Sequence, residues 1–318
     1  MRRPPANVLG AMLIVVSASS FGTLGPVTRY ADEAGVSSLA FATWRAGVGA
    51  IVVLVVVGAA AVAGVRLWKP LAEIPRRDRG FLALAAPINA ALNLAMFIAF
   101  LRIGVALALL TFYVYPAYVA VISVVWFGER LDRLRWLALA MSLTGVVLVV
   151  AGAGKLGSLD VVGIGLAVAA SLGQTFYSLA ANHGFRRVPG MQASAVTMGG
   201  ATLVYLLAAL VIGRLGEIAQ PFGSTAAFGP VLYSGLVGAG LPTICFITGI
   251  RLLGAPRASI LSTLEPVVGV TLTAILFGTV PAPIQVVGGA FIIAAGIVLQ
   301  LRPRGEVSDH EAVVEVSS

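Results

Sequence analysis

Residues 115–129, YPAYVAVISVVWFGE, and residues 265–279, EPVVGVTLTAILFGT, share the pattern that decides the fold. In each stretch the proline at the second position is followed 12 residues later by the glycine of a Phe-Gly pair, and the two stretches lie 150 residues apart. Residues 143–148 and 294–299, LTGVVL and AAGIVL, repeat a second pattern at an offset of 151. Proline and glycine at fixed spacing mark backbone features, so these matches indicate an internal duplication.

The composition is that of a membrane protein. The 318 residues are 59% hydrophobic and 11% charged, whereas a soluble domain carries about 25% charged residues. A bilayer core about 30 Å thick is crossed by about 20 helical residues. Apolar segments of about that length occupy residues 8–29, 36–58, 80–101, 105–127, 134–152, 161–182, 191–213, 227–250, 256–278 and 282–301. We therefore predict an all-α integral membrane protein with ten transmembrane helices.

The duplication divides the ten spans into two sets of five. The first repeat covers residues 8–152 and the second covers 161–301, while residues 302–318 form a short polar tail that we expect to be disordered and cytoplasmic. Two tandem units with an odd number of spans enter the membrane in opposite orientations. The sequence thus predicts two inverted five-helix repeats, an arrangement typical of secondary transporters.

Basic residues indicate the direction of the spans. With the N-terminus in the cytoplasm, 16 Lys and Arg residues fall in inner segments, and only Arg29, Arg102, Lys155 and Arg214 fall in outer ones. Because cytoplasmic loops carry the excess of Lys and Arg, we predict a multi-pass protein of the cell membrane with both termini in the cytoplasm. The net charge of +8 is spread over short clusters between spans, which provides no surface for nucleic acid.

Catalytic and metal chemistry have no support in the sequence. Cys245 lies inside an apolar run, and the two histidines, His183 and His310, lie in a loop and in the tail. These are too few for a disulfide framework or a Cys/His metal site. The chain also lacks a P-loop, an HExxH motif and a GxSxG motif. We expect no enzyme activity and no cofactor or metal.

Two charged residues lie deep inside predicted spans. Arg45 and Glu265 are each about nine residues from a span end, which places them about 14 Å deep, near the midplane. A charge at that depth is costly and is expected to face protein or water. Two interpretations stay open: Glu265 carries a proton for coupling, or Arg45 and Glu265 form an ion pair that holds two helices together.

Pro116 and Pro266 interrupt the fourth and ninth spans at equivalent positions. A proline removes one helical hydrogen bond. In transporters such breaks expose backbone groups to substrate, although a proline kink can also serve packing alone, and both interpretations are kept.

Further polar residues mark the candidate substrate site. They can bind a polar ligand, or bond across helices for about 0.6 kcal/mol each. The candidates are Tyr113, Tyr115, Asn89, Asn93, Gln174 and Tyr177.

Two other features have weaker functional implications. Glu129 and the charges after it form an inner loop cluster that suits gating or helix capping, or is simply a solvated loop. Small residues in the tenth span, Gly289, Ala290, Ala294 and Gly296, permit close helix contact within one chain or in a homodimer.

Over residues 8–301 the chain resembles the drug/metabolite transporter superfamily and its EamA-type ten-helix branch. The resemblance rests on Ser20-Phe21-Gly22, on Ala42-Thr43-Trp44-Arg45, on Phe-Gly-Glu-Arg-Leu at 127–131 and on Leu264-Glu265-Pro266. Thr279 departs from it, because the second half of such proteins usually repeats the Gly-Glu of the first. The resemblance implies a carrier that does not hydrolyse ATP and commonly exports amino acids or other small metabolites.

These observations favour a secondary or facilitative carrier that exports a small metabolite, such as an amino acid or amphipathic compound, by alternating access. Uptake or antiport by the same fold is an alternative, and a non-transporting membrane subunit is another. The expected partners are the lipid bilayer and a small-molecule substrate; coupling to a proton stays open.

Overall fold

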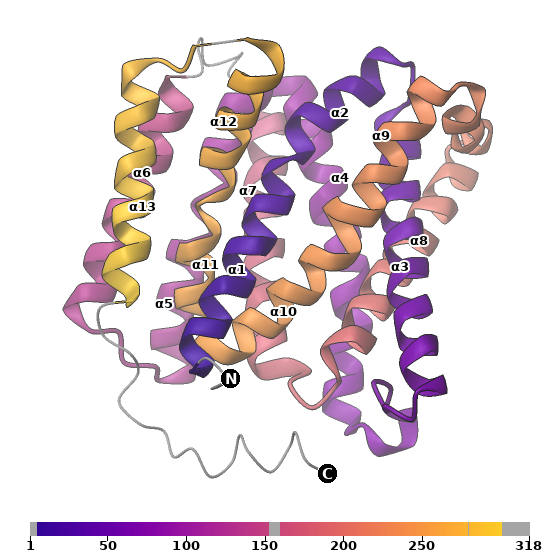
Figure 1. Cartoon of the computed structure of the whole chain (residues 1–318), viewed down its shortest axis with the longest axis horizontal. Helices are drawn as coiled ribbons and strands as arrows, with labels where there is room; N and C mark the ends of the chain where they lie inside the picture. Colours follow the sequence, from indigo (N-terminus) through magenta and orange to yellow (C-terminus); the bar gives the residue numbers. More distant parts are fainter. Residues whose placement is uncertain (1–4, 153–159, 279, 301–318) are drawn as a thin grey trace.

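The computed structural model describes residues 5–152, 160–278 and 280–300, and these are helical with short connections (Figure 1). The first half contains α1 (Ala6–Gly22), α2 (Leu24–Glu33), α3 (Ser38–Val62), α4 (Arg76–Phe112), α5 (Tyr115–Phe127) and α6 (Arg133–Ala151), with the short 3-10 turn η1 (Leu71–Glu73). The second half contains α7 (Val161–Leu179), η2 (Ala180–Gly184), α8 (Gly190–Val211), η3 (Leu215–Gly223), α9 (Thr225–Gly235), η4 (Leu236–Gly240), α10 (Leu241–Leu253), α11 (Ala255–Ser262), α12 (Glu265–Phe277) and α13 (Pro283–Gln300). The predicted tail at 302–318 and Thr279 lie outside the described residues.

The predicted membrane-spanning architecture is confirmed. Within the described residues, nine helical stretches are long and apolar enough to cross a membrane, and the shorter apolar helix Pro283–Leu299 occupies the tenth position. Polar caps begin several of them: Ser37, Asp132, Asp160 and Ser224 each accept a backbone N–H of the first helical turn. In eight of the nine stretches fewer than half of the residues are buried inside the molecule, as expected for helices covered by lipid, whereas Thr225–Leu253 is mostly buried.

The segment α4 contains a reversal of the chain. Ile103 lies against Gly163 near the start of α7, whereas Phe127, at the end of α5, stacks on His183 just beyond the end of α7. The 20 residues from Gly163 to His183 rise about 30 Å, so Ile103 and Phe127 lie at opposite ends of the molecule. The stretches Arg76–Met96 and Leu107–Phe127 are accordingly separate spans that run in opposite directions. We refer below to the two ends of α7 as the Val161 end and the His183 end.

Corresponding helices of the two repeats pack against one another and run antiparallel. Along α6 and α13, Gly145 meets Gly288 and Gly152 meets Gln285, so residue numbers rise in one helix as they fall in the other. The contacts of Gly47 with Thr202 and of Gly49 with Met198 show the same for α3 and α8. Equivalent helices that run in opposite directions are the geometry of inverted repeats.

The remaining helix pairs follow the same symmetry. The third span of each repeat packs on the first span of the other, as α4 on α7 and as α10 on α1, and the fourth spans meet through α5 and α11. Figure 1 shows α6 and α13 side by side at one edge of the molecule, with α1 and α10 crossing its middle. The fourth and ninth spans therefore meet in the interior, between the two repeats.

Candidate functional site

Arg45 on α3 lies at the centre of a hydrogen-bonded network inside the molecule. Its Nη1 donates to Asn93 Oδ1 (3.2 Å), and its Nε and Nη2 donate to the carbonyl of Gly238 (3.3 and 3.1 Å). Asn93 in turn donates through Nδ2 to the carbonyl (2.8 Å) and to Oδ1 (2.9 Å) of Asn89, one turn earlier on α4. The guanidinium also lies 5.9 Å from the ring centroid of Phe21 on α1. Partners from three other elements show that Arg45 faces protein rather than lipid.

A π-helical turn supplies the carbonyl that accepts from Arg45. The turn η4 interrupts the regular hydrogen bonding between α9 and α10, and Gly238 is its middle residue. π-turns within helices are rare and occur frequently at functional sites. Leu24 packs closely on Gly238, so that an added Cβ would lie 2.4 Å from Leu24 Cδ2 and would displace that side chain.

Both the fourth and the ninth span are interrupted just before a proline. The turn at Tyr113–Val114 separates α4 from α5, and the turn at Thr263–Leu264 separates α11 from α12. Pro116 and Pro266 are the second residues of the helices that follow. Since proline has no N–H, the carbonyl four residues before each one loses its helical donor. We call these two interruptions the first and second helix breaks.

The two helix breaks contact each other. The Tyr113 hydroxyl is a hydrogen-bond partner of the Glu265 carboxylate, and the Tyr115 hydroxyl reaches the carbonyl of Ser259 (3.5 Å). Gly22 of α1 packs against the second break, where an added Cβ would lie 2.8 Å from the Glu265 carbonyl oxygen. Side chains of each break thus reach the other across the boundary between the repeats.

Arg45 and Glu265 interact at a distance but do not form an ion pair within the described part of the chain. Each contributes to the electrostatic environment of the other, while the hydrogen bonds of Arg45 go to Gly238 and Asn93. The direct pair, one of the two interpretations left open by the sequence, is not formed in this state. Proton coupling through Glu265 stays a prediction.

Accessibility differs on the two sides of this site. Arg45, Asn89, Asn93 and Glu265 are partly exposed, and we call these four residues with Tyr113 the central polar cluster. Toward the His183 end the chain is tightly packed: Tyr113 and Tyr115 are 1% and 2% exposed, and the residues from 253 to 263 are buried. Toward the Val161 end, residues 107, 109–112, 264, 265 and 267–270 retain partial exposure. The cluster is therefore sealed on the His183 side.

The other candidates from the sequence lie outside the central polar cluster. Tyr177 is buried, and its ring stacks on that of Phe246 in α10 with the ring centroids 6.3 Å apart. It therefore belongs to the packing between α7 and α10. Gln174, three residues earlier, is partly exposed. In α13, Gly289 faces Val267 and Gly296 faces Leu261 of the same chain.

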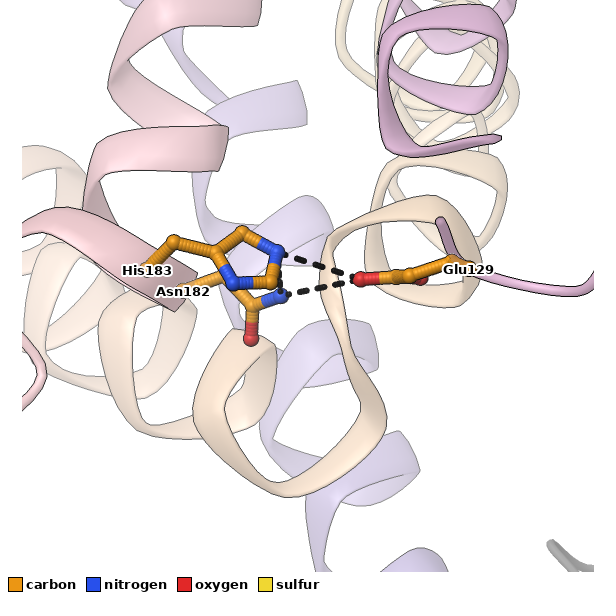
Figure 2. A network of polar contacts seen from close by, with 3 residues as sticks. All are labelled: Glu129, Asn182 and His183. Carbon is orange, nitrogen blue, oxygen red and sulfur yellow. Dashed lines mark hydrogen bonds and ion pairs between the residues drawn. The ribbon is translucent and has the colours of Figure 1, made fainter. Parts of the chain in front are cut away.

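A second polar network lies at the His183 end (Figure 2). Glu129 Oε1 lies 3.1 Å from His183 Nε2 and 3.5 Å from Asn182 Nδ2, and those two nitrogens are 2.9 Å apart. The sequence places His183 in a loop, but the residue belongs to the second π-helical turn, η2. Asp132, from the same inner cluster, caps α6 by accepting the N–H of Arg135 (2.9 Å).

The Val161 end has a simpler contact. Arg102 and Asp160 form an ion pair of 2.6 Å. Partial desolvation acts against ionisation of Asp160, but hydrogen bonds from the Val162 N–H and from Arg102 outweigh it, and the pKa of the carboxyl is lowered from its ordinary value. Lys155, predicted for the same side, lies outside the described residues.

The sequence did not predict that the carbonyl of Gly238 accepts from Arg45. It also did not predict that Phe21 of α1 and Tyr205 of α8 approach Arg45. The glycine-rich run Gly-Leu-Val-Gly-Ala-Gly at 235–240 was the available signal for the first of these. Glycines at this density inside an apolar span allow an irregular turn and close approach of the backbone.

Comparisons with known proteins agree with this architecture. Several solved structures match the chain; a crystal structure of a protein among them has a TM-score of 0.73 and 19% sequence identity, over 93% of this chain and 97% of the other, which shows a shared fold. No curated protein matches the sequence. The sequence profile of the EamA-like transporter family matches residues 8–151 and 161–301, one match in each half. The chain therefore belongs to the EamA-like transporter family, the proteins of which move solutes across membranes.

Proposed function

We propose that this protein is a secondary or facilitative exporter of a small polar metabolite, such as an amino acid or an amphipathic compound, and that it works by alternating access. The observation that carries the proposal is the central polar cluster, which places one cationic and one acidic side chain between the two inverted repeats. In transporters built from inverted repeats, substrate binds at the midplane between the halves.

The bonding of Arg45 suits a residue that receives a ligand. Its partners are neutral, the carbonyl of Gly238 and the amide of Asn93. A carboxylate or other anionic group of a substrate would replace them with stronger, charge-assisted hydrogen bonds. Glu265 is held by the hydroxyl of Tyr113 and would in the same way receive a cationic group, or a proton.

The helix breaks support alternating access. In this state they contact each other through Tyr113 with Glu265 and Tyr115 with Ser259, on the sealed side of the cluster. Separation of the repeats at the His183 end would part these contacts and expose the cluster to that side. Two arrangements of the same inverted halves are what alternating access requires.

The direction rests on the charge distribution. The inner segments predicted from the sequence carry 16 of the basic residues and the outer ones four, which favours the His183 end and both termini on the cytoplasmic side of the cell membrane. Export then moves the substrate from the His183 end to the Val161 end.

A solute panel in overproducing cells tests the proposal, scored for resistance and for reduced accumulation. Transport by the purified protein in vesicles of known orientation follows. Export predicts uptake into inverted vesicles, whereas an uptake carrier would load right-side-out vesicles and an antiporter would need a countersolute. Arg45→Gln should lose transport and Arg214→Gln, at an exposed position, should keep it. No solute movement with any member of the panel, together with tolerance of Arg45→Gln in cells, would favour a non-transporting membrane subunit.

A further inference from the structure

The network of Glu129, Asn182 and His183 joins the two repeats at one end of the molecule. Glu129 follows Gly128, whose left-handed conformation (φ 64°) ends α5 in the first repeat. Asn182 and His183 belong to η2, which ends the first span of the second repeat. Figure 2 shows both side chains of η2 reaching toward the same carboxylate oxygen. Contacts that link separate repeats at the sealed end bear directly on whether that end can open.

The three polar atoms form a triangle in which only two sides can be hydrogen bonds at once. The Asn182 amide nitrogen only donates, and the Glu129 carboxylate only accepts when it is ionised. His183 Nε2 either donates, if it carries a hydrogen, or accepts, if it does not. When Nε2 carries a hydrogen, Glu129 accepts from both His183 and Asn182. When Nε2 is bare, Asn182 donates to it and the direct contact between His183 and Glu129 is no longer a bond.

A ring stack and packed neighbours hold His183 in this position. Phe127, two residues before Glu129, lies parallel to the imidazole with ring centroids 3.9 Å apart and planes inclined by 6°. Gly184, next to His183, packs so closely on Phe81 of α4 that an added Cβ would lie 2.8 Å from the ring. The imidazole is therefore placed rigidly against Glu129, and the hydrogen on Nε2 decides which bonds form.

Other ionisable groups surround this end. The elements that contact η2 are α4, α7 and α10. Their ionisable side chains are Arg76, Arg77, Asp78, Arg79 and Arg102 on α4, Tyr177 on α7, and Cys245 and Arg251 on α10. Glu129 and Arg130 follow α5, and Arg186 and Arg187 lie in the loop after η2. Asp78 accepts the N–H of Arg187 (3.2 Å), and Arg251 donates to the carbonyl of Phe185 (3.0 Å). Glu129 is the acid in contact with the imidazole.

We propose that His183 is a proton-binding residue that latches the His183 end of this transporter. Protonated, it donates a charge-assisted bond from Nε2 to Glu129 and holds the two repeats together. When His183 is neutral, its contact with Glu129 loses the positive charge: either Nε2 keeps its hydrogen and donates a weaker neutral bond, or Nε2 is bare and accepts from Asn182. In both cases the contact between the repeats is weaker, and this end opens more readily. Imidazole is the side chain that ordinarily titrates between pH 5 and 8, so the latch responds to the pH on its own side of the membrane. The inference rests on the proposed alternating access for its transport consequence, but the latch itself is measurable without any substrate.

The test measures access to the sealed region as a function of pH. Ser259, 1% exposed between the second helix break and the His183 end, is replaced by cysteine in a Cys245→Ala background, and vesicles receive a membrane-impermeant maleimide on the His183 side. The labelling rate at each pH is divided by that of Arg66→Cys, a variant at an exposed position. This division removes the intrinsic pH dependence of thiol reactivity. With His183 intact, the normalised rate should rise about tenfold between pH 5.5 and 8.5, the effect of losing one charge-assisted hydrogen bond.

Three variants decide the outcome. His183→Gln should flatten the profile, and Glu129→Gln should raise the rate at low pH. Asp160→Asn, which removes the ion pair with Arg102 at the opposite end, should leave the profile unchanged. Melting of each purified protein at pH 6 and pH 8 separates a latch from a folding defect, because only the intact network should be more stable at pH 6 than at pH 8.

The proposal would be overturned by the same pH profile in His183→Gln and the parent, or by access that falls as pH rises. Its failure is distinct from failure of the proposed function. A pH-dependent latch in a protein that moves no solute would retain the inference and remove the transport proposal. Transport by a protein whose seal does not respond to pH would retain the transport proposal and remove the inference of a latch.

Discussion

The two helix breaks have nearly the same backbone and different side chains. α5 and α12 each begin one residue before a proline and end at a left-handed glycine, with φ of 64° at Gly128 and 63° at Gly278. The residue before the proline is Tyr115 in the first break and Glu265 in the second. Tyr115 is buried and reaches a carbonyl of α11, whereas Glu265 is partly exposed beside Tyr113. The equivalent backbone of the two breaks preserves the symmetry of the fold. The side chain that differs between them, Glu265, is the one available to bind a ligand.

Arg45 shows the same asymmetry. The repeat offsets of 150 and 151 place Ala195 and Val196 at the equivalent position, and α8 carries no charged residue at all. The cation thus comes from the first repeat and the carboxylate from the second, and neither is duplicated. A site built in this way binds its ligand across the boundary between the repeats, so any relative motion of the two halves changes the site.

The largest expected effect comes from removing the unmatched charge. Glu265→Gln keeps the shape of the second break and removes its charge, and we expect a loss of transport of about a hundredfold, the effect of losing a charged hydrogen-bond acceptor worth about 3 kcal/mol. Transport measured at several pH values should also lose its pH dependence if Glu265 carries the proton. Unchanged activity with an unchanged pH profile would exclude that role.

A smaller effect, a loss of stability, should follow from Gly22→Ala, because the added methyl group pushes α1 away from the second break only. The added Cβ would lie 2.8 Å from the Glu265 carbonyl oxygen and 2.8 Å from Val268 Cβ. Forced overpacking of this kind costs about 1–3 kcal/mol, which should lower the melting temperature of the purified protein. Gly58→Ala is the matched control, because nothing lies within 4 Å of its added Cβ. Equal melting of the two variants would contradict the close contact.

Arg45→Lys keeps the charge but loses the planar group that reaches Gly238 and Asn93 together. We expect substrate affinity to fall about tenfold, because an ammonium cannot reproduce the geometry of a guanidinium that bonds two partners at once. Binding measured by calorimetry, once a substrate has been found, gives the number. Affinity equal to that of the parent would show that only the charge matters.

The smallest effect is expected at the first break. Tyr115→Phe removes a long hydrogen bond of 3.5 Å to the Ser259 carbonyl, and stability should change by no more than about 1 kcal/mol. Thermal unfolding in detergent and transport in vesicles measure the two consequences. A loss of transport as large as that of Glu265→Gln would mean that the two breaks are equivalent in function, and would contradict a special role for the second break.

The sequence predicts those parts of the molecule that depend on local chemistry. Hydropathy identifies the ten spans because each must satisfy its own backbone in lipid, and the spacing of Pro116 and Gly128 shows the duplication because both residues impose backbone geometry. The depth of Arg45 and Glu265 follows from counting residues along a helix. The two prolines coincide with the interruptions at 113–114 and 263–264.

The partners of these residues could not be predicted in the same way. The acceptor of Arg45 is a backbone carbonyl in a π-helical turn. Because every residue has a carbonyl, the residue types do not show which one is the acceptor. His183 follows an apolar run and precedes two arginines, a context that indicates a loop end, yet tertiary contacts with Phe127 and Phe81 hold it in a π-helical turn. Which spans pack together depends on the whole arrangement of the two repeats, and no local pattern encodes it.

The contact between α6 and α13 has a consequence for how these sequences can vary. A Cβ on Gly145 would lie 2.6 Å from the carbonyl oxygen of Gly288, and one on Gly288 would lie 2.7 Å from that of Gly145. When a side chain obstructs another side chain, a smaller residue opposite can compensate, but an obstruction by main chain has no such remedy. In a library of random variants, positions 145 and 288 should therefore keep glycine whatever else changes, while Gly165 and Gly199, which have open space around them, should drift freely.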